Sequence, residues 1–301
     1  MLPASLFMLI WLGILVFIAG GWPLAPPLGS WRPGVSRAVP GVGMTAIWWA
    51  LTVATVLVAQ LFMAWPEFLP YGVVGFWLTL LWGVNLASWP LAGKVRPSIA
   101  LVVGAIVIYG ATSAIYYGLV KPSIVPPDYM VGLLLWHVAW LLVFSPAFIT
   151  QGSPFRRLKQ PGLGVAELVL SFILAYVSWD VFTLRMGLAT PQFSFGVAAS
   201  GVIMWSLAYS WAFSFAGVAK YRQPKRGVLA FMVMVAIVAA WTAIMWAPLQ
   251  WPEPKLPIEL AATYFNLCVV MPALVAHNAF WLRAPLAPPT PLGAPPPDQG
   301  V

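Results

Sequence analysis

A few ionisable side chains lie within long apolar stretches of this chain, and they are its first candidates for proton transfer or substrate binding. His137 and Asp180 fall in two consecutive stretches that are joined by a basic turn, and Glu167 lies near the start of the second stretch. An ionisable group is costly in hydrocarbon, so it normally faces protein or water and marks a functional position. Counted from the turn, His137 and Asp180 lie at similar depths, which would allow a proton-relay pair. We therefore treat His137, Asp180 and Glu167 as candidate catalytic, proton-handling groups.

His137 and Asp180 also have a simpler interpretation, in which both lie near the outer interface and their side chains reach toward water. Asp180 lies shortly before Arg185, at the outer end of its stretch, where its side chain would reach interfacial water. Tyr176 lies at helical spacing from Asp180 and would complete a polar patch there. The same interfacial interpretation, at the other end of the bundle, applies to Glu167 and to His277 in the last stretch.

Uncharged polar side chains form a second set of candidates, which would line a substrate path. Asn85 lies in the third apolar stretch, and Asn266 and His277 lie about three helical turns apart on one face of the last stretch. Ser210 belongs to a line of serines spaced four residues apart. For these serines the alternative is close helix packing with a hydrogen bond to the backbone. The substrate-binding candidates are Asn85, Tyr176, Ser210, Asn266 and His277.

Membrane-spanning helices would have to hold these side chains. The 301 residues are 61% hydrophobic and only 7% charged, whereas a soluble domain has about 25% charged residues. A span needs about 20 apolar residues, and stretches of that length without strand-like alternation recur along the chain. Their limits are 4–22, 44–64, 71–91, 98–119, 130–150, 164–184, 194–217, 227–247 and 259–282. The sequence therefore predicts an all-α, polytopic membrane protein with about nine transmembrane helices.

The distribution of basic residues predicts the orientation. Twelve of the 15 lysines and arginines fall in alternate loops or after the last stretch: Arg32, Arg37, Lys94, Arg96, Arg156, Arg157, Lys159, Lys220, Arg222, Lys225, Arg226 and Arg283. The other loops hold only Lys121, Arg185 and Lys255. By the positive-inside rule the N-terminus lies outside and the C-terminus in the cytoplasm of a cell that carries the protein in its inner or plasma membrane. The formal charge of +8 is thus a loop property, and nucleic acid is not an expected partner.

Short sequences recur at a separation of about 121 to 126 residues, which predicts an internal repeat. Pro40 to Gly43 matches Pro161 to Gly164, and the segment from Gly83 to Pro97 resembles the segment from Ser206 to Pro224. A repeated unit of four helices keeps its orientation, so the copies would be related by an axis along the membrane normal. The predicted organisation is a first unit at 1–127, a second at 128–254, a ninth helix at 255–283 and a disordered Pro-rich cytoplasmic tail at 284–301. The alternative is that Pro-Gly turns and basic loops recur by chance.

Several cofactor chemistries have no support in the sequence. The two histidines lie at different depths, which argues against bis-histidine haem ligation, and with the lone Cys268 they do not form a usual metal site. No phosphate-binding glycine motif is present, and no lysine lies inside a helix to form a Schiff base. We therefore expect no cofactor and no metal.

Three functions remain open, and all have the lipid bilayer as the first partner. A transporter or permease for a small substrate would use a polar seam between two repeats. A membrane-embedded enzyme would act on a lipid or isoprenoid with Asp180 or Glu167 as general acid. A quinone-reactive anchor, which resembles membrane subunits of the polysulfide-reductase type in its paired four-helix bundles, would bind protein partners at the basic cytoplasmic face. We expect the transporter first.

Overall fold

The structure, a computed structural model, describes residues 2–19, 38–91, 93–249 and 258–281, and within them the chain is helical with no β-strand. The all-α prediction is confirmed for this part of the chain. The predicted tail at 284–301 lies outside the described residues. So do four of the cations used to predict the orientation, which are Arg32, Arg37, Lys255 and Arg283.

The helices form continuous rods, several of which widen into π-helical turns, labelled η, along their length. The first four are α1 (Leu2–Gly13) with η1 (Ile14–Ala19), α2 (Ala38–Ala59), α3 (Phe68–Leu80) with η3 (Leu81–Asn85), and α4 (Pro97–Ile115) with η4 (Tyr116–Val120). A short 3-10 turn, η2 (Trp65–Glu67), precedes α3. Helix α4 opens on a proline, whose fixed φ suits the first helical turn and whose missing N–H has no partner there anyway.

The remaining rods continue the same pattern. They are α5 (Pro127–Phe144), α6 (Gly162–Tyr176) with η5 (Val177–Arg185), the composite of α7 (Pro191–Phe193), η6 (Ser194–Ala199), α8 (Ser200–Leu207) and η7 (Ala208–Ala212), then α9 (Lys225–Leu249), and the composite of α10 (Ile258–Thr263), η8 (Tyr264–Val270) and α11 (Met271–Ala279). Each predicted apolar stretch overlaps one of these rods within the described residues.

Seven of the described helices are long and apolar enough to cross a membrane, so the molecule has the character of an integral membrane protein. The apolar helix Ala4–Ala19 is shorter than these seven, and the α10–α11 rod is not among them. The count of nine spans and the tandem repeat therefore stay predictions.

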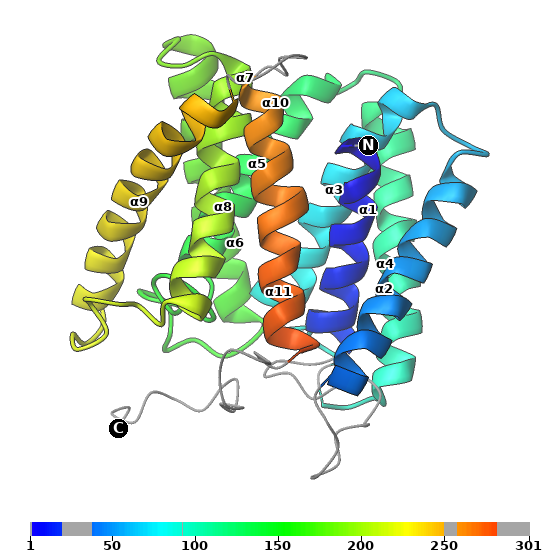
Figure 1. The fold of residues 1–301 in the computed structure, drawn as a ribbon, viewed down its shortest axis with the longest axis horizontal. Helices are drawn as coiled ribbons and strands as arrows, with labels where there is room; N and C mark the ends of the chain where they lie inside the picture. The colour runs from blue at the N-terminus through cyan, green and yellow to red at the C-terminus, as the bar shows by residue number, and fades with distance from the viewer. Residues whose placement is uncertain (1, 20–37, 92, 250–257, 282–301) are drawn as a thin grey trace.

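The rods fall into an inner and an outer set. Helices α1, α3, α5, α8 and the α10–α11 rod pack one against the next, and η8 and α11 return to α1 to close the ring. We call these the inner helices, and we call α2, α4, α6 and α9 the outer helices. In the most apolar part of each span, 67%, 61% and 72% of the residues are buried for the rods of α3, α5 and α8, respectively. The corresponding shares for α2, α4, α6 and α9 are only 22%, 22%, 28% and 17%. Figure 1 shows α9 at one edge of the bundle and α2 and α4 at the other.

The first helix is buried on all sides because glycines let α3 approach it closely. A Cβ atom added to Gly72 would lie 2.5 Å from Cβ of Leu6, and one added to Gly83 would lie 2.7 Å from Cβ of Phe17. Small residues at helix contacts are the usual basis of close packing in membranes, where lipid is as apolar as leucine. This contact holds η3, which carries Asn85, in the centre of the bundle.

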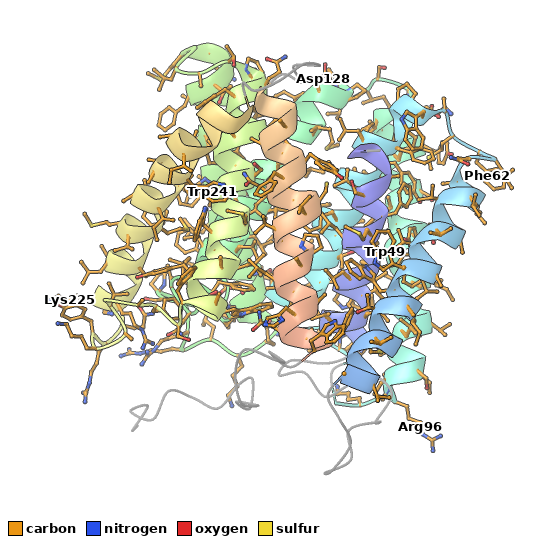
Figure 2. The ribbon with its side chains drawn as sticks, viewed as in Figure 1. Trp49, Phe62, Arg96, Asp128, Lys225 and Trp241 are labelled. Atoms are coloured by element: carbon orange, nitrogen blue, oxygen red, sulfur yellow. The ribbon has the colours of Figure 1, made fainter. Side chains whose placement is uncertain are left out.

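The two ends of the bundle differ in charge. Arg96 and Lys225 lie at one end, where α4 and α9 begin, whereas Asp128 lies at the opposite end, where α5 begins (Figure 2). We call the first of these the basic end.

Candidate functional site

Helix α6 turns a polar stripe toward the protein and an apolar surface outward. Its buried residues are Gly164, Glu167, Ser171 and Ala175, which recur every three or four positions and so form one face. The other faces carry exposed apolar side chains, among them Val165, Val169, Phe172 and Ile173. A soluble amphipathic helix buries its apolar face, whereas α6 buries its polar face and exposes its apolar ones. A helix that faces lipid requires this arrangement. The stripe faces α5 and η3, so α6 positions its polar groups against both predicted units.

Glu167 and Asn85 form the centre of the candidate site, which we call the inner polar cluster together with His137, Ser171 and Trp77. Both Glu167 and Asn85 are fully buried, and Nδ2 of Asn85 donates a 2.7 Å hydrogen bond to Oε2 of Glu167. The other carboxylate oxygen, Oε1 of Glu167, and the carboxamide oxygen, Oδ1 of Asn85, are buried and have no hydrogen-bond partner among the described residues. Buried polar atoms are normally paired, so two unpaired acceptors side by side point to a missing donor or cation.

The loop before α6 fixes the position of this pair. Nε2 of Gln160 donates a 2.9 Å hydrogen bond to the carbonyl oxygen of Asn85, and Oε1 of Gln160 accepts one of 3.2 Å from the backbone N–H of Gly164. Gly152 lies nearby with φ of +77°, and a Cβ atom on it would lie 3.5 Å from Oε1 of Glu167. The loop between α5 and α6 therefore covers the carboxylate at the basic end.

His137 on α5 lies against Ser171, which is one turn further along α6 than Glu167, and it is held on both ring nitrogens. The indole N–H of Trp77 donates a 2.8 Å hydrogen bond to Nδ1, and Nε2 lies 3.0 Å from Oγ of Ser171. Because Nδ1 accepts, a neutral ring carries its proton on Nε2 and donates it to Ser171. Ser171 in turn donates to the carbonyl oxygen of Leu168 at 3.1 Å. Trp77, His137 and Ser171 thus form a continuous hydrogen-bonded chain across α3, α5 and α6.

Asp180 belongs to a separate cluster at the other end of the same rod, so the His137–Asp180 pairing considered from the sequence is wrong. Oδ2 of Asp180 lies 2.5 Å from Nε of Arg185, and the hydroxyl of Tyr129 lies 3.4 Å from Oδ1. Arg185 also donates a 2.9 Å hydrogen bond to the hydroxyl of Tyr176, and its own side chain is 66% exposed. Arg185 reaches outward near the end of the rod, as the interfacial interpretation expects, whereas the Asp180 side chain that it pairs with is only 13% exposed.

Two candidates further along the chain, Ser210 of the second predicted unit and Asn266 of the predicted ninth helix, have protein partners. Oδ1 of Asn266 accepts a hydrogen bond from the indole of Trp241 and its Nδ2 donates one to Ser200, each at 3.0 Å. Ser210 donates to the carbonyl oxygen of Ser206 at 2.6 Å, which is the backbone bond that the packing alternative predicts. His277 is half-buried near the end of α11. None of these three contacts the inner polar cluster through a described hydrogen bond.

Three residues that contact the Glu167–Asn85 pair or His137 were not among the candidates named from the sequence. Ser171 could have been found, because it lies four residues after Glu167 and therefore on its face. Trp77 could not be separated from the other tryptophans, of which the chain has 18. Gln160 lies in a loop, where its sequence position carries no signal of burial.

The cluster offers one carboxylate, one carboxamide and one imidazole. The part of the chain that the structure describes has no group of three or more His, Cys, Asp or Glu residues placed to hold a metal ion. Cys268 is a buried free thiol. The inner polar cluster could therefore take up a proton or a small cation, or accept hydrogen bonds from a solute.

A scan against protein-family models and searches of curated proteins and of solved structures find no match to this chain.

Proposed function

We propose that this integral membrane protein is a transporter for a small solute, in which the inner polar cluster carries the solute or a coupled proton. The observation that supports it most is the Glu167–Asn85 pair, which is fully buried yet leaves one acceptor oxygen of each residue without a partner. An ionisable group kept at such a position in a membrane-spanning bundle usually serves a substrate or proton path.

The location of the pair suits alternating access. Asn85 comes from the first predicted unit, whereas Glu167 and His137 come from the second. Transporters built from repeats place their substrate sites at the contact between repeats, where a rocking motion exposes the site to each side in turn. The hydrogen bond between Asn85 and Glu167 would break and re-form during that motion.

In this proposal the basic end faces the cytoplasm. Arg96 and Lys225 share that end, opposite Asp128, as the positive-inside rule requires for loops of one side (Figure 2). The chain would then enter from outside through α1 and expose its C-terminus to the cytoplasm. Reporter fusions in the loops at Arg96 and Asp128 test this orientation, which would be wrong if both reporters gave the same sidedness or the reverse one.

The geometry favours transport over a lipid-directed enzyme. An enzyme that used Asp180 or Glu167 as general acid would need that carboxylate in the wall of a lipid-sized cavity. Cavities of about 700 and 410 Å³ lie in the described part of the chain, and Asp180 and Glu167 line neither of these two.

Solute-dependent proton movement in proteoliposomes tests the proposal. Vesicles that contain a pH-sensitive dye are presented with a fixed panel of amino acids, sugars, carboxylates and nucleobases. We expect one class of solute to give a proton flux, which Glu167→Gln abolishes because the amide cannot carry a proton across. Asp180→Asn is the matched control on the same helix and should keep the flux. A flux that survives Glu167→Gln, or no flux with any member of the panel, would refute the proposal.

A further inference from the structure

A cavity of about 700 Å³ lies between the helices of the first predicted unit, and we call it the first cavity. Its wall comes from α1, α2, α3 and α4, and it is rich in aromatic rings, namely Phe7, Trp11, Phe62, Tyr71, Tyr109 and Tyr117. Val58, Phe62 and Tyr117 are exposed on the outer helices α2 and α4. The cavity therefore opens sideways, toward the position of lipid, and its size is that of an ordinary small-molecule site.

Hydrogen-bond donors remain unused inside this cavity. The hydroxyl of Tyr109 is buried beside Thr55 and makes no hydrogen bond of ordinary geometry within the described structure. The hydroxyls of Tyr71 and Ser113 lie 3.1 Å apart, so one of their two hydrogens serves their mutual bond and the other is left over. Thr55 accepts from Trp11 at 2.7 Å and donates to the carbonyl oxygen of Leu51 at 2.8 Å, so its own hydrogen is used and one lone pair remains. The cavity thus presents two donors to an occupant that must supply acceptors.

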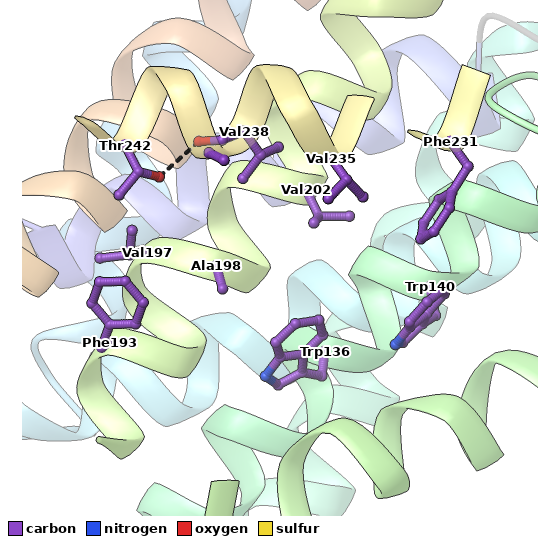
Figure 3. Close-up of a pocket in the computed structure, with 11 residues that line it drawn as sticks. Trp136, Trp140, Phe193, Val197, Ala198, Val202, Phe231, Val235, Val238 and Thr242 are labelled. Carbon is purple, nitrogen blue, oxygen red and sulfur yellow. Dashed lines mark hydrogen bonds between the residues drawn. The ribbon is translucent and has the colours of Figure 1, made fainter. Parts of the chain in front are cut away.

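The second predicted unit has a smaller cavity, of about 410 Å³, which we call the second cavity. It lies between α5, the α7–α8 rod and α9, and its donors are all used (Figure 3). The indoles of Trp136 and Trp140 donate to Ser194 and Ser178, each at 2.9 Å. The hydroxyl of Thr242 donates to the carbonyl oxygen of Val238 at 2.8 Å, as the dashed line in Figure 3 shows. Only hydrocarbon fits such a lining without leaving a polar atom unpaired.

Four residues in the lining of the first cavity have a counterpart in the lining of the second at about the separation of the predicted repeat. The matched residues, 122 to 126 positions apart, are Trp11 with Trp136, Tyr71 with Phe193, Tyr109 with Val235, and Ser113 with Ala239. Aromatic side chains line both cavities, whereas the hydroxyl-bearing Tyr71, Tyr109 and Ser113 of the first are matched by apolar side chains in the second. The polar groups are therefore a property of one cavity and are not needed to pack a unit of this kind.

We propose that the first cavity binds a bilayer-resident molecule whose planar ring carries carbonyl oxygens, of the isoprenoid-quinone class. Tyr109 donates to one carbonyl and the Tyr71–Ser113 pair supplies the second donor. Aromatic walls favour a flat ring in stacked or edge contacts. The opening between α2 and α4 admits the molecule from the membrane, and its chain leaves by the same route. This inference is independent of the transport proposal, because no lining residue belongs to the inner polar cluster.

Ester carbonyls of phospholipids share the acceptor chemistry, so the test has two arms. The protein in phosphatidylcholine nanodiscs is irradiated with a photoreactive decyl-chain benzoquinone or with a phosphatidylcholine that has a photoreactive acyl chain. Labelled peptides are then identified by mass spectrometry. We expect the quinone to label the α2 and α4 segments of the first cavity, with displacement by excess unmodified decyl-benzoquinone.

Variants that give the first cavity the chemistry of the second complete the test. Tyr109→Phe and Ser113→Ala should each weaken quinone binding about two- to tenfold, the equivalent of one hydrogen bond. Thr242→Val in the second cavity is the control and should change nothing. Thermal unfolding of each variant shows whether the fold is kept. Quinone labelling that is equal in both cavities or insensitive to Tyr109→Phe, or phosphatidylcholine labelling of the first cavity that the quinone does not displace, would overturn the proposal.

Discussion

The rod formed by α6 and η5 carries two carboxylates, Glu167 and Asp180, that meet opposite environments. Glu167 is fully buried, and its described hydrogen bond comes from Asn85, a residue of the first predicted unit. Asp180 is paired with Arg185, a residue of the same rod whose side chain is mostly exposed. The two acids are thus alike in sequence, each an isolated charge in an apolar helix, and differ in what the rest of the bundle places beside them.

This difference separates a structural charge from a candidate functional one. An ion pair whose arginine is largely exposed is screened by solvent and contributes little to stability. A buried carboxylate with one amide donor and one unpaired oxygen is costly to keep and is retained where it has a use. Three substitutions along this rod and its partners test the contrast, in order of decreasing expected effect on the free energy of unfolding.

Asn85→Leu should have the largest effect. It removes the amide donor and leaves the Glu167 carboxylate buried without its described partner, which we expect to lower the free energy of unfolding by about 2–3 kcal/mol. The measurement is reversible unfolding in detergent micelles. The double variant Asn85→Leu/Glu167→Leu should recover most of the loss, because replacing both partners by apolar groups is nearly neutral. A double variant as unstable as the single one would show that the pair is not the cause.

His137→Leu should have an intermediate effect. It leaves the indole N–H of Trp77 and the hydroxyl of Ser171 without the imidazole. We expect a loss of about 1–2 kcal/mol, since interhelical hydrogen bonds in membranes contribute at most about that much each. Val169→Ala, on the exposed face of the neighbouring helix, is the control for general loss of side-chain contact. The hydrogen-bonded chain would lose its support if both variants cost the same, or if adding Trp77→Phe to His137→Leu recovered nothing.

Asp180→Asn should have the smallest effect. The partner Arg185 is 66% exposed, so we expect a loss below about 1 kcal/mol. The loss should shrink further in high salt, which screens exposed charges. Unfolding of the variant and of the parent chain at low and high ionic strength measures both quantities. A loss that equals that of Asn85→Leu would remove the distinction between the two carboxylates.

Much of this picture followed from the order of the residues. The long apolar stretches specify helices, because a backbone in hydrocarbon must satisfy its own hydrogen bonds. The interfacial nature of Asp180 was also readable, since Arg185 lies close to it in sequence and on the same rod. Glu167, Asn85 and His137 could be named as candidates because polar groups in such stretches are rare.

The partners of these candidates could not be read in the same way. Asn85 and Glu167 are 82 residues apart, and Trp77 and His137 are 60 apart. Which rods are neighbours depends on packing, and here glycines bring α3 against α1 and so place η3 beside α6. Hydropathy indicates which helices can lie in lipid, but it does not indicate which helices pack against each other.

The sequence by itself determined that this chain is a helical membrane protein and which side chains are too polar for lipid, because those properties are local and additive along the chain. Only the tertiary structure decided that Glu167 meets Asn85 while Asp180 meets Arg185, that one cavity keeps free hydroxyls and the other has none, and that the helices sort into an inner and an outer set. These depend on contacts between distant segments, and such contacts form wherever side-chain shape allows two helices to approach.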